Sequence, residues 1–363
     1  MKIALIVTGG LHPSGRTQVV PAFMWLIERL SYTHEVHAFV LRHLEHPGTY
    51  ALAGATIHDL GRPKGAWSQW KTLRRALVAQ GPFNVIHGFW ADPAGVLASI
   101  AGRRLGIPTV VTCDTGELTS LPDINYGLQL HARGRALVAL VGRFATSVHV
   151  TTRFMETLAD TQGWSVTRIP MGVDLARVAA PAAGVDGPPW KLLQVASLNR
   201  VKDQATLLQA LAIARETLDV RLDLVGEDTL GGKLLDHAVS LGVSAAVTLH
   251  GFVPHDELGT FYRGAHLYVQ SSRHEGGGIA VLEAAASGLP IVGTRVGHVS
   301  DLAPHGAVAV PPADPSALAA AIVRLLHSPR ERTAIAAVAR RFAVSHDADW
   351  TARELMALYA SLL

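Results

Sequence analysis

Cysteine is almost absent from this sequence: Cys113 is the single one among 363 residues, so no intramolecular disulfide can form. A lone thiol fits a reducing compartment without establishing one. The sequence also has no run of 18 apolar residues, which argues against a membrane-spanning helix. Its first apolar run, residues 3–7, is too short for the core of a signal peptide, and we therefore expect a cytoplasmic protein.

Charged residues are scarce as well: Asp, Glu, Lys and Arg make up 17% of the chain, whereas hydrophobic residues make up 49%. Because a chain of this length and apolarity can bury large cores, the composition excludes a mainly disordered protein. No block of like charges indicates a nucleic-acid partner. The 18 histidines follow no metal-ligand spacing, so we expect no metal site.

The few charges are unevenly distributed. Residues 1–174 hold 16 Lys and Arg against 11 Asp and Glu, whereas the remainder holds 16 against 18. A basic first half suits an anionic substrate or a lipid surface, but ordinary scatter is the simpler explanation. Arg133, Arg135 and Arg143 follow one expected helix. They make either a weak peripheral contact with an anionic membrane or a solvated face, of which we favour the second.

Short apolar runs alternate with helical periodicity along the whole chain, a pattern typical of β-α units on parallel sheets. The expected strands of the first half are residues 2–7, 35–41, 55–59, 84–88, 109–113, 147–151 and 167–170, with helices at 21–31, 67–80 and 94–105. Those of the second half are residues 191–196, 221–225, 248–250, 267–270, 291–294 and 307–310, with helices at 203–217, 232–241, 256–263, 278–287, 315–327, 329–342 and 349–362. The pattern predicts two Rossmann-like, doubly wound parallel sheets whose ligands bind at the carboxyl ends of the strands, in a cleft between the two domains.

The most informative segment is residues 271–290, where a strand is followed by a polar, glycine-rich loop and then by a helix-forming run. Gly276, Gly277 and Gly278 let the backbone approach a ligand closely, and the start of a helix favours a phosphate. Glu275 and Glu283 can each accept hydrogen bonds from a pair of hydroxyls, one pair on a sugar ring and the other on a ribose. Taken alone, the same residues also fit a plain turn with solvated carboxylates.

Glu275, seven further residues, Glu283, an Ala-rich helix and Gly-Leu-Pro-Ile-Val at 288–292 resemble the donor-site signature of retaining glycosyltransferases of the GT-B fold, and among them the large family-4 group. The resemblance implies that Glu275 binds hydroxyls of the transferred sugar and that Glu283 binds the ribose. It also implies that the backbone amides of Gly276, Gly277, Gly278 and Ile279 bind the sugar and the diphosphate.

Two other segments of the second half fit the same resemblance. Lys202 falls on the Lys of the basic pair that grips the diphosphate, but the usual Arg falls on Ser197. Arg200 either replaces that Arg or the site has one cation fewer. The backbone of Phe252 and Val253 is implied to lie against the nucleobase, although a plain turn explains this segment equally well.

The first half is similar to the family too, though less specifically. Gly9 and Gly10 resemble the loop that approaches the diphosphate, and they do not match the G-x-G-x-x-G pattern of dinucleotide-binding domains. Family members often place a His near the sugar, and this position falls on Asp114, with Glu117 as a second candidate. Asp114 either bonds a sugar or acceptor hydroxyl or only caps a turn. His87 is either a site residue or a packed core histidine.

The resemblance covers nearly the whole chain and sets the expected domain limits. Residues 1–178 form an acceptor-side domain, the Pro-, Ala- and Gly-rich residues 179–189 form a linker, and residues 190–345 form the nucleotide-sugar donor domain. The C-terminal helix, within residues 346–363, is expected to cross back onto the first domain.

The resemblance to the family implies a retaining, metal-independent hexosyltransferase of carbohydrate or glycoconjugate biosynthesis. It needs no cofactor, because a nucleotide-diphosphate sugar is its co-substrate, and its acceptor is a saccharide, a lipid-linked molecule or a small molecule. Glu275, Lys202 and Asp114 are the expected catalytic residues, acting by position and charge. The alternatives are a nucleotide-sugar epimerase of similar shape and a non-catalytic GT-B binding or partner protein. The sequence leaves open the sugar, the base, the acceptor and the oligomeric state.

Overall fold

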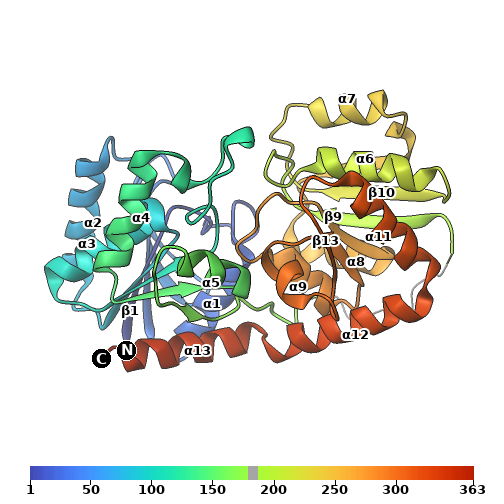
Figure 1. Ribbon diagram of the computed structural model, residues 1–363. Helices are drawn as coiled ribbons and strands as arrows, with labels where there is room; N and C mark the ends of the chain where they lie inside the picture. The colour runs from blue at the N-terminus through green and yellow to red at the C-terminus, as the bar shows by residue number, and fades with distance from the viewer. Residues whose placement is uncertain (179–186) are drawn as a thin grey trace. The chain divides into compact units, whose positions relative to one another are not determined.

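The computed structural model describes residues 1–178 and 187–363, so most of the expected linker at 179–189 lies outside the described residues. The chain divides into two compact units. Unit 1 consists of Met1–Met171 together with Ala348–Leu363, and unit 2 consists of Gly172–Asp347. Figure 1 shows that each unit is a twisted sheet with helices on both faces, which is a doubly wound α/β arrangement.

Unit 1 contains an eight-stranded sheet with the order β3-β4-β2-β1-β5-β6-β7-β8. Its strands are β1 (Lys2–Val7), β2 (Glu35–Val40), β3 (Gly48–Leu52), β4 (Ala55–Asp59), β5 (Val85–Phe89), β6 (Thr109–Cys113), β7 (Ser147–Val150) and β8 (Thr167–Arg168). Its helices are α1 (Pro21–Ser31), α2 (Ala66–Gln80), α3 (Val96–Leu105), α4 (Ala132–Phe144), α5 (Arg153–Asp160) and α13 (Ala348–Ser361), with short turns η1 (Ala91–Gly95), η2 (Pro122–Ile124) and η3 (Leu128–Leu130).

Unit 2 contains a six-stranded, wholly parallel sheet with the order β11-β10-β9-β12-β13-β14. Its strands are β9 (Trp190–Val195), β10 (Val220–Val225), β11 (Val247–Gly251), β12 (Leu267–Gln270), β13 (Ile291–Thr294) and β14 (Val308–Val310). Its helices are α6 (Gln204–Arg215), α7 (Lys233–Ser240), α8 (Gly259–Gly264), α9 (Ile279–Ala286), α10 (Gly297–Leu302), α11 (Pro315–His327) and α12 (Pro329–Ser345), with turns η4 (Ser244–Ala246) and η5 (His255–Glu257).

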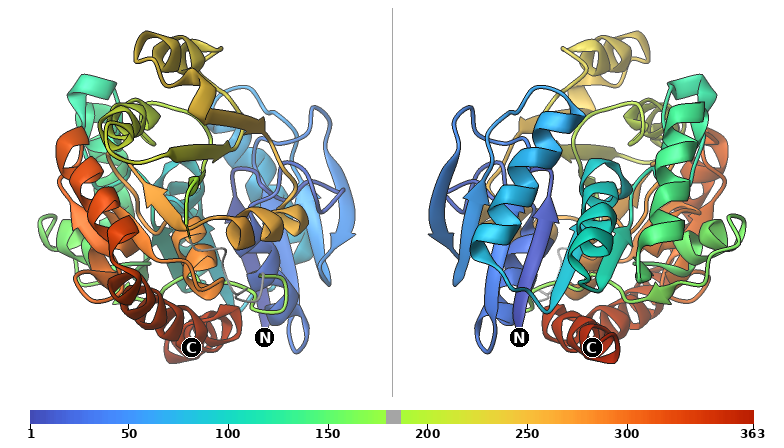
Figure 2. Two further views of the ribbon diagram at one scale, coloured as in Figure 1. Left: turned by 90° about the vertical axis from the view of Figure 1, so that its right-hand side faces the viewer. Right: turned by 90° about the vertical axis from the view of Figure 1, so that its left-hand side faces the viewer.

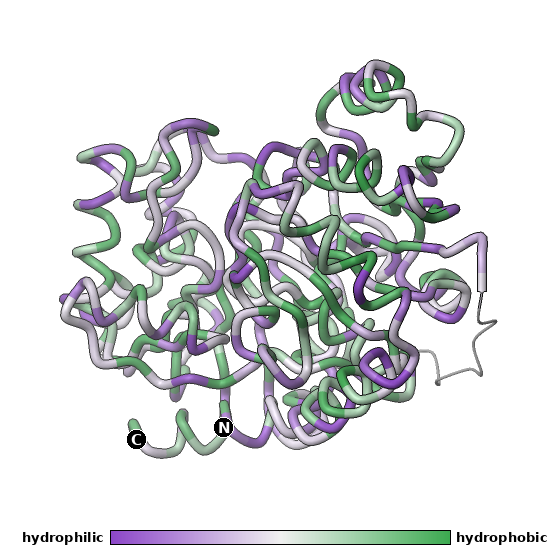
Figure 3. Tube along the Cα trace, turned by 45° about the vertical axis from the view of Figure 1, so that its right-hand side comes forward, coloured by the Kyte–Doolittle hydropathy of each residue, from purple (hydrophilic) through white to green (hydrophobic). Residues whose placement is uncertain are grey.

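The strands are near-continuous apolar runs because helices cover both faces of each sheet. Leu192 of β9, Leu207 of α6 and Ile322 of α11 are fully buried in the core of unit 2. Side chains cap the starts of some helices: in α11 the side chain of Asp314 accepts a hydrogen bond from the amide of Ala317, and Pro315 occupies the first turn. In Figure 3 apolar residues, drawn in green, run through the interior of both units.

One strand departs from the expected parallel pattern. Residues Gly48–Leu52 form β3, which pairs antiparallel with β4 at the edge of the sheet of unit 1, where no strand was expected from the sequence. The segment Gly-Thr-Tyr-Ala-Leu is short and mostly exposed, so it lacks the apolar run that marks most of the other strands. An antiparallel edge strand of this kind is common on otherwise parallel sheets.

A buried polar chain ties α13 to the sheet of unit 1. His149 Nε2 lies 2.7 Å from the carbonyl oxygen of Ile169 and must donate to it, so Nδ1 of the neutral ring accepts from Thr112 Oγ1 at 2.7 Å. Thr112 Oγ1 in turn accepts from His87 Nε2 at 2.6 Å, and His87 Nδ1 accepts from the Tyr359 hydroxyl at 2.5 Å. Each link is satisfied only while both imidazoles are neutral.

Burial in this chain lowers the pKa of His149 to about 4, and burial together with the neighbouring His149 lowers the pKa of His87 well below its usual value. Folded His149 therefore stays neutral where the unfolded side chain binds a proton. Its contribution to stability is present above pH 6.5 and is lost as the pH falls towards about 4.

We therefore expect the free energies of unfolding of wild type and His149→Gln to converge as the pH is lowered from 7.5 to 5. The advantage of wild type should shrink by about 1 kcal/mol per pH unit below 6.5, because only wild type carries this suppressed protonation. Urea unfolding at several pH values measures the difference, with His305→Gln, at an exposed position, as the control. A pH-independent gap would contradict the neutral chain.

Candidate functional site

The strand order of unit 2 places a ligand site where β9 and β12 meet. These strands are adjacent and parallel, and the chain winds away from them in opposite directions, to β10 on one side and β13 on the other. Such a switch point leaves the loops after both strands free at the carboxyl edge of the sheet, where open α/β sheets bind ligands. The loop after β9 carries Lys202, and the loop after β12 carries Glu275.

The structure brings Lys202 and Glu275 together at this edge. Lys202 Nζ lies 2.5 Å from Glu275 Oε1, and the Ser272 hydroxyl donates to the same oxygen at 2.7 Å. The Lys202 side chain is 26% exposed and that of Glu275 is 10% exposed, so the ion pair is screened less than a surface pair. A cation and a carboxylate with hydrogen-bonding capacity to spare are thus held side by side.

The backbone around Lys202 is fixed by bonds that the sequence alone does not reveal. The side-chain oxygen of Asn199 accepts from the amides of Val201 and Lys202, each at 3.0 Å. The Ser271 hydroxyl donates to the carbonyl of Lys202 at 2.8 Å, and the amide of Arg273 donates to that of Val201 at 2.7 Å. The two loops therefore hold each other in place. Ser271, Ser272 and Asn199 are site residues that the sequence analysis missed.

The glycine loop ends at Gly278, which has φ +87° and directly precedes α9. The loop is braced from α10, because the amide of His298 donates to the carbonyl of Gly277 at 3.0 Å. A Cβ on Gly297 would lie 2.5 Å from that carbonyl, so only glycine permits this close approach. The backbone of Gly276 to Ile279 is thus presented at the start of a helix, next to Glu275.

Glu283 lies inside α9 and is 2% exposed. Its Oε2 accepts from the Tyr262 hydroxyl at 2.6 Å, and its Oε1 lies 2.7 Å from His255 Nε2. Burial, and then the charge of Glu283, raise the pKa of Tyr262 well above its usual value, so the phenol stays a donor. Two side chains from the segment 255–262 therefore orient a carboxylate that would otherwise be buried without partners.

The remaining residues expected in the donor site are more exposed. Phe252 is 55% exposed and Val253 is half-buried, both between β11 and η5. Arg200 is exposed in the turn that carries Lys202, and Ser197 is exposed at the end of β9, where its carbonyl accepts from Gln204 Nε2 at 3.2 Å. Arg200 is thus nearer than Ser197 to Lys202 along the chain, and its side chain is exposed to solvent.

In unit 1 the loop after β1 carries Gly9 and Gly10. A Cβ on Gly10 would lie 2.6 Å from Val20 Cγ2, and φ at Gly10 is +84°. The amide of Val20 donates to the carbonyl of Gly10 at 2.9 Å, and Leu11 pairs with Val19. Residues 11–19 therefore form a closed loop before α1. This loop explains why α1 begins as late as Pro21.

Asp114 and Glu117 lie after β6, and both contact the residues that follow β5. Trp90 Nε1 donates to Asp114 Oδ1 at 2.8 Å, and the amides of Thr115 and Ala91 donate to the Glu117 carboxylate at 2.7 and 3.4 Å. Burial raises the pKa of Glu117, although these amide bonds oppose the shift. Trp90, with φ +68°, was not recognised as a site residue from the sequence.

His87 bonds to Tyr359 and Thr112 and not to these carboxylates. Its ring is fully buried, and both nitrogens are bonded to Tyr359 and Thr112 in the chain that anchors α13. This geometry favours the packed-core alternative. Within the described ranges, no group of three or more His, Cys, Asp or Glu side chains is arranged to hold a metal ion. No helix in the same ranges is long and apolar enough to cross a membrane.

Comparison with known proteins adds family evidence to this geometry. Residues 19–172 match the model of the glycosyl transferase 4-like domain, and residues 179–342 match that of glycosyl transferases group 1. A D-inositol 3-phosphate glycosyltransferase of Thermobispora bispora is 29% identical over 313 residues, which are 79% of this chain and 73% of the relative.

Solved structures agree on the fold. Sucrose-phosphate synthase from Thermosynechococcus elongatus superposes with a TM-score of 0.83 at 19% identity, over 100% of this chain and 99% of that one. HepE of Anabaena, solved with UDP and glucose, superposes with a TM-score of 0.76 at 18% identity, over 100% of both chains. The two α/β units thus have the GT-B architecture, which confirms the expected fold.

We expect loss of the Tyr262 hydroxyl, which donates to a carboxylate, to destabilise the protein more than loss of the Tyr268 hydroxyl, which donates to a more distant backbone carbonyl. Tyr262→Phe removes a donor from a buried carboxylate and should cost about 2 kcal/mol in the free energy of unfolding. Tyr268 is the matched control, because it is also buried in unit 2 but donates to the carbonyl of Val195 at 3.4 Å, and Tyr268→Phe should cost less than about 1 kcal/mol.

Chemical denaturation of both variants and wild type measures the two costs. Equal costs, or a larger cost for Tyr268→Phe, would show that the bond between Tyr262 and Glu283 does not hold this carboxylate.

Proposed function

The chain belongs to the glycosyl transferases of group 1, and we propose that it binds a nucleoside diphosphate sugar at the carboxyl edge of β9 and β12 and transfers the sugar to an acceptor hydroxyl. The observation that carries this proposal is the placement of Lys202, Glu275 and Glu283 around one glycine loop at the switch point of unit 2. One cation and two separate carboxylates match a ligand with one anionic centre between two hydroxylated rings.

Lys202 would bind the diphosphate. Its ammonium has three donors, of which Glu275 uses one, so it can hold the carboxylate and a phosphate oxygen at the same time. Charge would build up on the diphosphate as the bond to the sugar breaks, and a cation already in place stabilises that charge without reorganisation. Arg200, exposed in the same turn, would supply the second cation in place of the missing Arg at Ser197.

The amides of Gly276 to Ile279 and the positive end of the α9 dipole would add to this stabilisation. Glu275 would accept bonds from hydroxyls of the transferred sugar through the lone pairs that Lys202 and Ser272 leave unused. The sugar and its leaving group would then be held by one continuous loop, which fixes their mutual geometry.

Glu283 would bind the ribose. Oε2 of its carboxylate already accepts a hydrogen bond from the Tyr262 hydroxyl, and Oε1 already has His255 Nε2 as a partner. Each oxygen has capacity for a second hydrogen bond. A carboxylate held in this way loses little side-chain entropy when ribose hydroxyls bind. The backbone of Phe252 and Val253, which leads into the turn that carries His255, would lie against the base.

Unit 1 would supply the acceptor side. Gly9 and Gly10 would approach the diphosphate, and Asp114, held by Trp90, would accept a bond from a sugar or acceptor hydroxyl. With no side chain acting as nucleophile, the acceptor would attack on the face from which the diphosphate leaves, and the diphosphate would take the acceptor proton. This route retains the anomeric configuration and requires no metal ion.

The test of the donor site is a thermal-shift titration with UDP, GDP, ADP and their sugar conjugates. A nucleotide at about 100 times its Kd should stabilise the fold by about 2.7 kcal/mol, and Glu283→Ala should lose most of this shift. Glu216→Ala, an exposed carboxylate of the same unit, is the control and should keep it. No shift with any nucleotide, and no slow hydrolysis of any sugar nucleotide, would favour a non-catalytic binding protein.

Transfer itself is tested by comparing Lys202, in the loop after β9, with a lysine near the amino end of that strand. Lys202→Ala should lower kcat/KM by about 100-fold or more, because it removes a charge that faces the leaving diphosphate. Lys191 lies exposed at the amino end of the same strand, and Lys191→Ala should leave kcat/KM within about twofold. Equal effects of the two changes would remove Lys202 from the mechanism.

D-Inositol 3-phosphate is the first acceptor to include, because similar proteins are named for it, and UDP-glucose is the first donor, because HepE of Anabaena was solved with it. A parallel reaction without acceptor separates transfer from epimerisation. Conversion of the sugar nucleotide into a stereoisomer under these conditions would favour the epimerase alternative.

A further inference from the structure

One face of unit 1 has a charge distribution that the transfer reaction does not use. From residue 60 to residue 113 the sequence contains seven Lys and Arg but a single acidic residue, Asp92. Helix α4 adds three Arg and has no acidic residue. The overall excess of the chain is only +3, so a large share of its basic character gathers in helices α2, α3 and α4.

These three helices form a layer over one face of the sheet. The right-hand view of Figure 2 shows α2, α3 and α4, in blue, cyan and green, next to one another in front of the strands. Each helix buries its apolar side: Leu73 and Leu77 in α2, Ala101 in α3, Val138 and Val141 in α4. Their outer sides therefore carry the charges.

We define the basic face as six exposed side chains on this layer: Lys71, Arg74, Arg75, Arg103, Arg104 and Arg143. Within residues 1–178 and 187–363, none of the six forms an ion pair with a carboxylate. Like charges that gather without counter-charges repel one another and destabilise the folded state. An external anionic partner would remove that cost.

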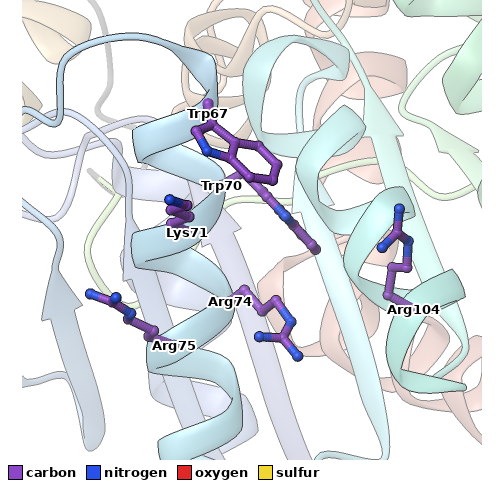
Figure 4. A pocket seen from close by; sticks show the side chains of 6 residues that line it. All are labelled: Trp67, Trp70, Lys71, Arg74, Arg75 and Arg104. Carbon is purple, nitrogen blue, oxygen red and sulfur yellow. The ribbon is translucent and has the colours of Figure 1, made fainter.

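A pocket of about 380 Å³ lies within this face, between α2 and the end of α3. Figure 4 shows that Trp67, Trp70 and Arg74 line it from α2 and that Arg104 lines it from α3. Lys71 Nζ lies 5.2 Å from the centre of the Trp67 ring. Two guanidinium groups on opposite sides of a groove suit a phosphate group, to which Arg donates in pairs.

The apolar residues of the same helix distinguish between anionic partners. Trp67, Lys71, Arg74 and Val78 follow one another at helical spacing and so share one side of α2, where Trp67 is 67% exposed and Val78 is 57% exposed. A free phosphate or a nucleic-acid backbone would need the charges but not the exposed Val78. Tryptophan and aliphatic residues mixed with Lys and Arg are typical of helices that lie at a bilayer interface.

We propose that the basic face docks unit 1 on an anionic phospholipid bilayer, with a lipid headgroup phosphate in the groove between α2 and α3. Trp67 and Val78 enter the headgroup region, and the six basic side chains face the negative surface. A layer of three neighbouring helices matches an extended surface better than it matches a single small ligand. This inference rests on unit 1 alone and does not depend on the proposed transfer reaction.

The experiment is co-sedimentation of the full chain with vesicles of phosphatidylcholine, with and without phosphatidylglycerol. We expect binding to the anionic vesicles only and a decrease of that binding with added salt. Arg74→Gln/Arg75→Gln should weaken binding roughly 30-fold, since each basic residue near such a surface contributes roughly fivefold. Trp67→Ser should also weaken binding, because the interfacial aromatic ring is lost.

The matched control is Arg340→Gln/Arg341→Gln, an exposed Arg pair on α12 of unit 2 with the same change in charge, which should bind like wild type. An unchanged thermal transition for each variant shows that it is folded. Equal binding to neutral vesicles, equal loss in both double variants, or binding to soluble polyphosphate but not to anionic vesicles would overturn the proposal.

Discussion

The contact between Lys202 and Glu275 depends on one feature of topology, the adjacency of β9 and β12 at the switch point of unit 2. The two residues are 73 positions apart in the chain, yet each lies in the loop that leaves its strand at the same edge of the sheet. If β9 paired with any other strand at this point, the cation and the glycine loop would be separated. The proposed roles of Ser272, the glycine loop and Glu283 all presuppose this pairing.

Apart from Asp114 of unit 1, the side chains proposed to bind the donor all belong to unit 2, so most of the proposed donor site lies within one compact unit. Unit 1 has its own internal constraint, the buried chain from Tyr359 through His87, Thr112 and His149 to Ile169. Through it the C-terminal helix belongs to unit 1, although the sequence reaches that helix only after completing unit 2. The basic face lies on the side of the unit 1 sheet that is covered by α2, α3 and α4.

The sequence predicted the elements that depend on local pattern. The glycine loop, Glu275 and Glu283 could be placed because a strand, a loop and a helix start each leave a local signal in composition, whereas the role of Lys202 was implied only by the resemblance to the glycosyltransferase family. The partners of these residues could not, because the bonds from Tyr262 and His255 to Glu283 span 21 and 28 positions and depend on packing. Trp90 was missed because its bond to Asp114 also joins residues that are far apart in the chain, and the edge strand β3 was missed because it is short and mostly exposed. His87 stayed ambiguous because its partner Tyr359 lies 272 positions away.

The central claim is that a nucleoside diphosphate sugar binds between Lys202, the glycine loop and Glu283, and a crystal structure with such a donor bound tests it most directly. The account predicts a phosphate oxygen within hydrogen-bond distance of Lys202 Nζ and the amides of Gly276 to Ile279. It also predicts ribose hydroxyls on Glu283, with the bond from Tyr262 retained. A donor bound elsewhere, with the Lys202–Glu275 pair unchanged and no ribose contact at Glu283, would contradict the account.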